Sequence, residues 1–481
     1  MRELCVGSLS CRPLINGHLG VDVFFVLSGL LVVSNLLKCQ PPTTKTFLKF
    51  YIRRIFRICP SFYFTYGIYC GIAGLIGGPA RRCDFPGEVM KNVLFYQNEY
   101  PVAEQCMAWG WTVAVEVQFY VLAPLVTFLP NLIFPKAKEN NLYALTTLIP
   151  LTVLLIVPRT TIPFDYNPPL TSLQLLTSTA HNSSDNYFHR MYASSETRIF
   201  SCFMGGAAGC VLQHIRNSSV WNDAKSQETK YRLLITNSIS TISFALIVFL
   251  IFSDYTEIFS LDSSDSNFLI YFRPCFSLFL SVFLLSLGVS RHLTNLLNTL
   301  ETELVGVVVN DGGNSIIRAF VGGEDNDDGL PKKALSYVTG LVNKILTPSW
   351  YKINSHTAHI TSYDSFLLHP LLINGLYLVF LDDLKPHAMS NSDLPYLYVC
   401  LVLFNFYTAH FFASLMYCLI GKPMLDVGDR LLEKMGLGRN AVEAIKYVER
   451  AVTEEGEGGE EDDRESLLLS ENDIDDENNR L

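Results

Sequence analysis

The stretch Gly20-Val-Asp-Val-Phe-Phe-Val-Leu-Ser-Gly-Leu-Leu-Val32 decides the fold class of this chain. It belongs to an apolar run from Leu19 to Leu37 that is long enough to cross the hydrocarbon core of a bilayer as a helix. One carboxylate, Asp22, lies near the start of this run. A carboxylate inside such a helix is expensive unless it faces the protein interior, so Asp22 is a candidate functional residue. The alternative is that Asp22 caps a helix at the level of the headgroups.

The composition of the whole chain fits a protein with many membrane spans. Of its 481 residues, 49% are hydrophobic and only 17% are charged, fewer than in a typical globular chain. The formal net charge of -10 is concentrated at the C-terminus, where residues 453–481 hold 13 of the 46 acidic side chains. The remaining chain is close to neutral, so nothing indicates nucleic-acid binding. The twelve cysteines lack the spacing of metal ligands, so the sequence predicts no metal site.

Apolar runs recur along the sequence and predict an all-α protein, a polytopic bundle of about nine transmembrane helices. One of these runs contains Gly205, Gly206 and Gly209, a composition that favours close helix packing. We expect spans at 19–37, 60–79, 110–130, 142–157, 198–214, 233–253, 268–290, 364–382 and 397–420.

The membrane domain is expected to cover residues 19–425, after a short lumenal segment at 1–18. A stretch rich in Gly, Asn and Asp at 291–345 predicts a flexible cytosolic insertion. Residues 426–481 are expected to form a cytosolic tail that is acidic and disordered from about residue 453.

Basic residues between the first two runs set the orientation in the membrane. Lys45, Lys49, Arg53, Arg54 and Arg57 lie in what we expect to be a loop, and the positive-inside rule places this loop in the cytosol. Alternation of nine spans then places the C-terminus in the cytosol and the N-terminus in the lumen. Because the N-terminal residues lack the apolar core of a signal peptide, we expect a further upstream segment with at least one more helix.

Two features of the predicted lumenal loops agree with this orientation. Cys83 and Cys106 share one predicted lumenal loop, where a disulfide can persist. Asn182 begins an Asn-Ser-Ser glycosylation sequon in another lumenal loop. The sequence leaves open whether the membrane is that of the endoplasmic reticulum, an endosome or the cell surface.

Arginines precede the second span in the pattern Arg53-Arg54-Ile-Phe-Arg57-Ile-Cys-Pro60. Arg54 and Arg57 are three residues apart, so a helix places them on one face. Paired guanidinium groups suit a phosphate-bearing ligand, because each can bind two oxygens at once. The alternative is an ordinary positive-inside anchor beside anionic lipid.

Two further ionisable residues fall inside predicted spans. Glu116 is a second intramembrane carboxylate, and its structural alternative is a group neutralised by burial or by an arginine from another helix. His369 suits a general base or a proton relay. Its alternative is a buried histidine bonded to a backbone carbonyl that the following proline frees.

Two arginines, Arg198 and Arg273, lie at the lumenal ends of spans. Each is expected either to pair with one of the intramembrane carboxylates, forming a structural ion pair, or to anchor its helix at the interface.

Four motifs follow one another along the chain. They are Gly20-Val-Asp-Val-Phe-Phe-Val-Leu-Ser-Gly-Leu30, Arg53-Arg54-x-x-Arg57-Ile-x-Pro60, Trp111-Thr-Val-Ala-Val-Glu-Val-Gln-Phe-Tyr-Val-Leu-Ala-Pro124 and Ser365-Phe-Leu-Leu-His-Pro370. Taken in this order, they resemble the membrane acyltransferase-3 family, and within it the animal branch called nose resistant to fluoxetine. The resemblance spans about residues 19–425.

This resemblance implies a bundle of about ten helices that transfers an acyl group, other than an amino-acyl group. The donor would be cytosolic acyl-CoA or a similar co-substrate, with no bound cofactor, and the acceptor a lipid, a sugar or a small molecule. The basic motif would bind the donor, and ionisable residues within the spans would supply the base that activates an acceptor hydroxyl. These are Arg53, Arg54 and Arg57 for donor binding, and Asp22, Glu116 and His369 for catalysis.

The chain departs from the family pattern in three places. The family's first helix, with its arginine and catalytic histidine, has no counterpart, and neither has the cysteine-rich lumenal domain of the animal branch. The closing helix reads Gly421-Lys-Pro423 where the family has Glu-x-Pro. These departures leave two alternatives open. One is a lipid or drug transporter with ionisable residues along its path, and the other is a non-catalytic paralogue that binds acyl donors.

Overall fold

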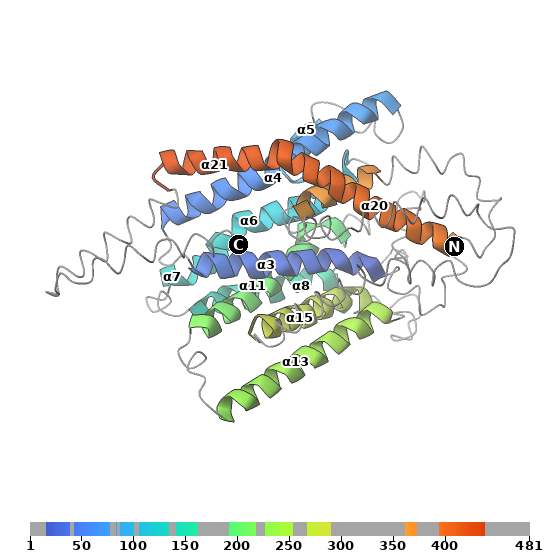
Figure 1. The fold of residues 1–481 in the computed structure, drawn as a ribbon. Coiled ribbons are helices and arrows are strands. Elements are labelled where there is room, and N and C mark those ends of the chain that lie inside the picture. The colour runs from blue at the N-terminus through green and yellow to red at the C-terminus, as the bar shows by residue number, and fades with distance from the viewer. Residues whose placement is uncertain are drawn as a thin grey trace, which may run out of the picture.

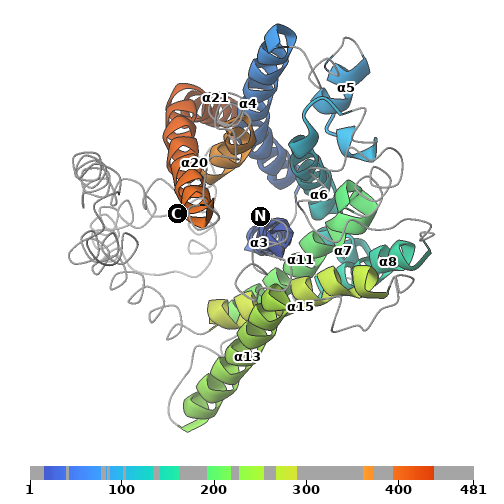
Figure 2. The ribbon, with the colours of Figure 1, turned by 90° about the vertical axis from the view of Figure 1, so that its right-hand side faces the viewer.

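The computed structural model describes residues 16–38, 43–76, 83, 87–100, 105–133, 141–161, 192–217, 227–253, 267–289, 361–372 and 394–437. Within these ranges all regular structure is helical, and the long helices lie side by side with α3 in the middle (Figures 1 and 2). The long helices are α3 (Gly20–Lys38), α4 (Thr44–Ile76), α6 (Trp111–Phe128), α8 (Leu145–Thr161), α11 (Ser195–Asn217), α13 (Gln227–Phe252), α15 (Asn267–Val289), α20 (Leu394–Met416) and α21 (Lys422–Lys434). The short ones are η2 (Asn16–Leu19), α5 (Gly87–Val93), η4 (Gln97–Glu99), η6 (Ala108–Gly110), α7 (Pro130–Ile133) and η8 (Asn141–Ala144), together with a helix at 361–372.

Several helices are long and apolar enough to cross a membrane, so the described part of the chain is a helical membrane bundle. Five qualify fully, and each overlaps one of the nine predicted runs. The runs at 60–79 and 198–214 fall instead in α4 and α11, which carry more charged and polar residues. The run at 364–382 lies only partly within the described residues. The five are Gly20–Lys38, Ala108–Phe128, Leu234–Phe252, Phe272–Val289 and Phe404–Lys434, and a shorter apolar helix covers Asn141–Ile156.

The basic residues before the second span lie on a helix, which corrects the prediction of a loop. The backbone N–H of Thr46 donates to Thr43 Oγ1 at 3.2 Å, so Thr43 caps the start of α4. Lysine, arginine and leucine, which have high helix propensity, then continue the helix. Phe47 and Phe50 pack against the buried core and tie this first part of α4 to the bundle. The arginines of the motif therefore extend from a rigid element.

The closing helix continues past residue 425, where the membrane domain was expected to end. α20 passes through a π-helical turn, η13 (Tyr417–Gly421), directly into α21 (Figure 1). α21 then packs along α4, where a β-carbon on Gly428 would lie only 2.9 Å from Cγ of Phe56. The insertion predicted at 291–345 and the acidic segment from residue 453 lie outside the described residues.

Glycines bring α3 and α11 into direct backbone contact, as the glycine-rich composition predicted. A β-carbon on Gly29 would lie 1.8 Å from the carbonyl oxygen of Cys202. A β-carbon on Gly205 would lie 2.0 Å from that of Val26, and one on Gly209 would lie 2.4 Å from the carbonyl oxygen one turn further along α3. Small residues at a helix contact allow this approach, so packing rather than hydrophobic burial holds the two helices together in a membrane.

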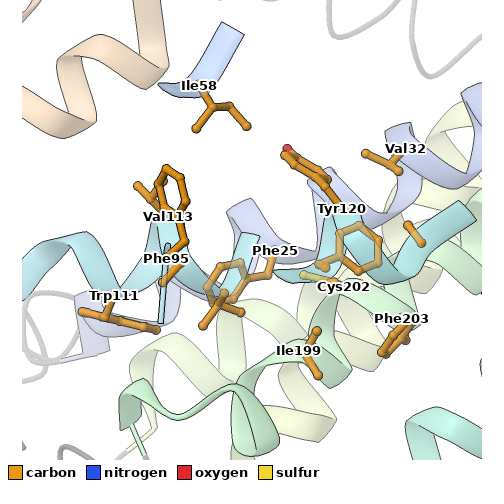
Figure 3. Packing of buried hydrophobic residues seen from close by; sticks show 14 of the residues in the cluster. Phe25, Val32, Ile58, Phe95, Trp111, Val113, Tyr120, Ile199, Cys202 and Phe203 are labelled. Atoms are coloured by element: carbon orange, nitrogen blue, oxygen red, sulfur yellow. The ribbon is translucent and has the colours of Figure 1, made fainter. Parts of the chain in front are cut away.

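Aromatic side chains fill the space around this contact (Figure 3). The ring of Phe25 on α3 meets Trp111 at the start of α6, with 6.1 Å between ring centroids. Further along α6, Phe119 meets Phe203 of α11 at 5.6 Å. This core fixes the position of α6, which carries Glu116, relative to α3, which carries Asp22.

Candidate functional site

Arg54 lies on an aromatic surface between α4 and α6. Its guanidinium carbon is 4.5 Å from the ring centroid of Tyr120 and 5.6 Å from that of Phe50. Its Nη1 donates to the hydroxyl oxygen of Tyr120 at 3.4 Å. The side chain is half-buried, so its position is fixed while part of it remains accessible to a ligand.

Glu116 lies one helical turn before Tyr120 and is part of the same network. The hydroxyl of Tyr120 donates to Oε1 of Glu116. Ser28 of α3 donates to the same oxygen at 3.0 Å, and its Oγ is also 3.0 Å from the Tyr120 hydroxyl. Both of these bonds go to Oε1, so this network does not use the other carboxylate oxygen, Oε2. α3, α4 and α6 thus converge on one half-buried carboxylate.

The other two arginines of the motif point elsewhere. Nη2 of Arg53 lies 3.9 Å from Oδ1 of Asp429 on α21, and the two side chains are 41% and 63% exposed. Arg57 is exposed and interacts electrostatically with Asp364 in the helix at 361–372. Of the three predicted donor-binding residues, Arg54 is therefore the one that the structure brings to Glu116.

Asp22 belongs to a separate, fully buried cluster. Nη1 of Arg198 donates to both carboxylate oxygens, at 2.9 and 3.0 Å, and Nη1 of Arg273 donates to Oδ2 at 2.9 Å. Tyr192 covers the pair of guanidinium groups, with its ring centroid 4.4 Å from the central carbon of Arg198 and 4.8 Å from that of Arg273. Both arginines thus pair with Asp22 and neither with Glu116. Arginines bond to both oxygens of Asp22, so this cluster links α3, α11 and α15.

Asp22 and Ser28 lie on the same helix but serve different clusters. Six residues along an α-helix correspond to a rotation of about 240°, so the two side chains point to different sides of α3. One side faces α11 and α15, and the other faces α6 and α4.

His369 is half-buried in the helix at 361–372, and its Nδ1 lies 2.7 Å from the carbonyl oxygen of Phe366 in the preceding turn. A carbonyl oxygen only accepts, so Nδ1 carries a proton and, in the neutral ring, Nε2 is left as the acceptor. The same helix approaches the network around Glu116 through Tyr363. This residue donates to the carbonyl oxygen of Ile58 at 3.2 Å and interacts electrostatically with Glu116. The structure thus places the helix of His369 beside the site but bonds the histidine to its own backbone.

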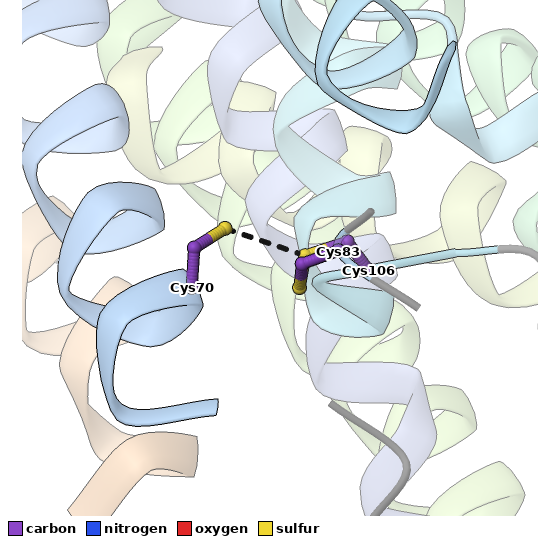
Figure 4. Close-up of a disulfide and its surroundings, with 3 residues drawn as sticks. All are labelled: Cys70, Cys83 and Cys106. Atoms are coloured by element: carbon purple, nitrogen blue, oxygen red, sulfur yellow. Dashed lines mark hydrogen bonds between the residues drawn. A yellow bond between two sulfur atoms is a disulfide. The ribbon is translucent and has the colours of Figure 1, made fainter. Parts of the chain in front are cut away.

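Cys83 and Cys106 are joined by a disulfide that lies at the start of α6 (Figure 4). A third cysteine, Cys70 near the end of α4, has its sulfur 3.6 Å from that of Cys106. Asn182, the predicted glycosylation site, lies outside the described residues.

Sequence reasoning missed two members of the network around Glu116. Tyr120 was detectable, because residues four apart share a face of a helix and Tyr120 follows Glu116 by four. Ser28 gave no such signal, since its contact with Glu116 depends on how α3 packs against α6.

Comparison with known proteins shows the family of the chain. A family model for the acyltransferase-3 domain, described as an acyltransferase domain, matches residues 5–315. The chain belongs to the acyltransferase-3 family. The matched residues include the first three of the four motifs, with Asp22, Arg54 and Glu116, whereas the motif that contains His369 lies beyond them.

Curated relatives match parts of this acyltransferase-3 chain. The Regulator of hypoxia-inducible factor 1 from Caenorhabditis elegans is 30% identical over 141 residues, which cover 28% of this chain and 27% of that protein. The O-acetyltransferase OatA from Staphylococcus aureus is 29% identical over 161 residues, which cover 31% of this chain and 26% of OatA. The matches thus span about a quarter of these relatives. No solved structure matches the chain.

Proposed function

We propose that this protein transfers an acyl group, other than an amino-acyl group, from a phosphate-bearing acyl donor such as acyl-CoA to a hydroxyl acceptor. One observation carries the proposal. Arg54, which suits a phosphate, and Glu116, which suits a general base, are joined through the hydroxyl of Tyr120. Family membership and the O-acetyltransferase relatives support the same reaction class.

Arg54 is the proposed donor-binding residue. A guanidinium group offers several N–H donors in a fixed planar arrangement that matches phosphate oxygens. Stacking on Tyr120 and Phe50 holds the group in place and uses only one of its N–H groups for the bond to Tyr120. Arg53 and Arg57 lie on the same helix as Arg54 and add positive charge to this end of it.

Glu116 is the proposed general base. Its carboxylate accepts the proton of an acceptor hydroxyl while the hydroxyl oxygen attacks the acyl carbonyl. The bond between the acyl carbon and its leaving group then breaks, and the leaving group takes that proton. A lipid, a sugar or a small molecule with a hydroxyl group fits this chemistry.

The proposed arrangement in the membrane follows the basic residues of α4. The positive-inside rule favours a cytosolic location for this end of the bundle, and therefore a cytosolic donor and a cytosolic C-terminus. The four sequence motifs favour the animal branch called nose resistant to fluoxetine. A transport path has less support, because Asp22 is enclosed with Arg198 and Arg273 instead of lining an open route.

The test uses the full chain in lipid nanodiscs with acetyl-CoA and palmitoyl-CoA as donors. Arg54→Ala should weaken coenzyme A binding by about 10-fold or more, the usual loss for a charge-assisted hydrogen bond. Glu116→Gln should leave binding unchanged but lower acyl transfer by about 100-fold or more. Lys45→Ala, which removes an exposed charge from the same helix, is the matched control.

Three results would count against the proposal. Wild-type coenzyme A binding by Arg54→Ala would show that the donor does not use this arginine. Solute flux in proteoliposomes without any acyl transfer would favour transport, and donor binding without a product would favour the non-catalytic paralogue.

A further inference from the structure

Ser28 has the geometry of an activated nucleophile. Its Oγ donates to Oε1 of Glu116 at 3.0 Å, the distance at which a carboxylate can remove the proton of a serine hydroxyl. The hydroxyl of Tyr120 lies 3.0 Å from the same Oγ, and Arg54 donates to that hydroxyl. Ser28 is thus in contact with the base and is linked to the proposed donor-binding residue, Arg54, through the hydroxyl of Tyr120.

The packing of α3 fixes Ser28 in this position. The next residue, Gly29, lies against the carbonyl group of Cys202, where a β-carbon would be 1.8 Å from the oxygen. α3 can therefore neither slide nor rotate past α11 without a clash, so the serine faces Glu116 in a defined orientation. A nucleophile held by rigid helices meets the positional demand of covalent catalysis.

Ser28 also lies on the open face of α3. Phe24 and Leu31, four residues before it and three after it, are 57% and 55% exposed, while Ser28 itself is half-buried. Side chains at this spacing share one face of a helix. Ser34, by contrast, is buried. An acyl chain attached to Ser28 would lie along an apolar face instead of entering the packed core.

We propose that Ser28 carries the acyl group as a covalent ester between donor and acceptor, which rests on the proposed function. In the first half, Ser28 Oγ attacks the thioester carbonyl and Glu116 takes the hydroxyl proton. The carbon–sulfur bond breaks, and the leaving thiolate takes that proton from Glu116. In the second half, Glu116 takes the proton of an acceptor hydroxyl, whose oxygen attacks the serine ester, and then returns the proton to Ser28 Oγ.

Tyr120 has a supporting role in this sequence. Its hydroxyl receives an N–H bond from Arg54 and lies 3.0 Å from the serine oxygen. Its own proton goes to Oε1 of Glu116, so the phenol holds this carboxylate beside Ser28 and links it to Arg54. The covalent route also lets donor and acceptor bind one after the other, so a single half-buried site serves both.

The experiment traps the intermediate in the absence of an acceptor. The full chain in nanodiscs is mixed with radiolabelled acetyl-CoA or with an alkyne-tagged palmitoyl-CoA, quenched in acid and mapped by peptide mass spectrometry. The label is expected on Ser28, and Glu116→Gln should slow labelling by about 100-fold or more. Ser28→Cys should give a thioester adduct that neutral hydroxylamine cleaves, and Ser28→Ala should give none. Ser34→Ala is the control on the same helix and should be labelled as the wild type is.

The outcomes separate this proposal from the proposed function. Transfer to N-acetylglucosamine or hexadecanol at wild-type rate by Ser28→Ala would overturn the covalent intermediate and leave the acyltransferase activity standing. If the wild-type protein shows no labelling and no transfer, both the covalent intermediate and the proposed function are overturned. Labelling of Ser28 without transfer to either probe would still support the intermediate, because it shows the first half of the reaction.

Discussion

Gly205 of α11 lies directly against Val26 of α3, where a β-carbon would be 2.0 Å from the valine carbonyl oxygen. Through this contact the two backbones touch without side chains between them. α3 carries both Asp22 and Ser28, so the contact positions the buried ion cluster and the candidate active site at once.

Gly205→Ala should destabilise the bundle. The added methyl group has no space, so α3 and α11 must separate, and overpacking of this kind costs about 1–3 kcal/mol of unfolding free energy or more. The measurement is unfolding in detergent micelles, followed by circular dichroism. Gly67→Ala on α4 is the control, because a β-carbon there meets nothing within 4 Å. Equal stability of the two variants would contradict the tight contact.

Arg198→Ala should be among the most damaging substitutions. It removes the side chain that bonds both oxygens of a fully buried Asp22, and breaking a buried pair from one side costs about 3–5 kcal/mol. Lys38→Ala removes an exposed charge from α3 and should change stability by less than about 1 kcal/mol. Unfolding of both variants in the same micelles checks this prediction, and a mild effect of Arg198→Ala would mean that water reaches the cluster.

Tyr120→Phe should separate donor binding from turnover. The phenylalanine ring keeps the surface on which Arg54 stacks but loses the hydroxyl shared with Glu116 and Ser28. We expect coenzyme A affinity to stay within about twofold, while acyl transfer falls by about 10-fold to 100-fold, the effect of one hydrogen bond to a charged group. Parallel loss of affinity and turnover would mean that the hydroxyl holds Arg54 rather than the reacting groups.

Cys83→Ser should redirect the disulfide. Without its partner, Cys106 is left 3.6 Å from the sulfur of Cys70, so oxidation is expected to join those two cysteines. Peptide mapping under non-reducing conditions detects the new cross-link, and Cys70→Ser combined with Cys83→Ser should leave Cys106 as a free thiol. Loss of the native bridge without a replacement should cost about 2–4 kcal/mol. A free Cys106 in the single variant would contradict the short distance.

The sequence predicted the helical bundle well because span length, glycine spacing and charge position are local properties. The glycine-rich composition around Gly205 was enough to predict a close helix contact. The start of α4 was predicted only in part. The spacing of Arg54 and Arg57 assumed a helix, but the positive-inside rule treated the same basic residues as a loop between spans. That rule gives the side of the membrane and says nothing of secondary structure. The N-cap at Thr43 and the aromatic residues after it were the overlooked signal.

The sequence could not predict in the same way which carboxylate each arginine pairs with. Arg198 and Arg273 were expected to pair with a carboxylate, but whether Asp22 or Glu116 depends on the rotation of α3 and α6 about their axes. The contact of Ser28 with Glu116 depends on the same rotation. Such relationships between helices are set by packing of the whole core.

The length of α4 also has a consequence for the size of the acceptor. Arg54 and Cys70 are sixteen residues apart on this helix, a rise of about 24 Å, which approaches the roughly 30 Å thickness of the hydrocarbon core. In the proposed reaction, a donor held by its phosphates at Arg54 therefore reacts near one membrane surface. An acceptor that arrives from the side of the disulfide has to bring its hydroxyl across most of that distance, which favours slender or flexible acceptors over bulky, rigid ones.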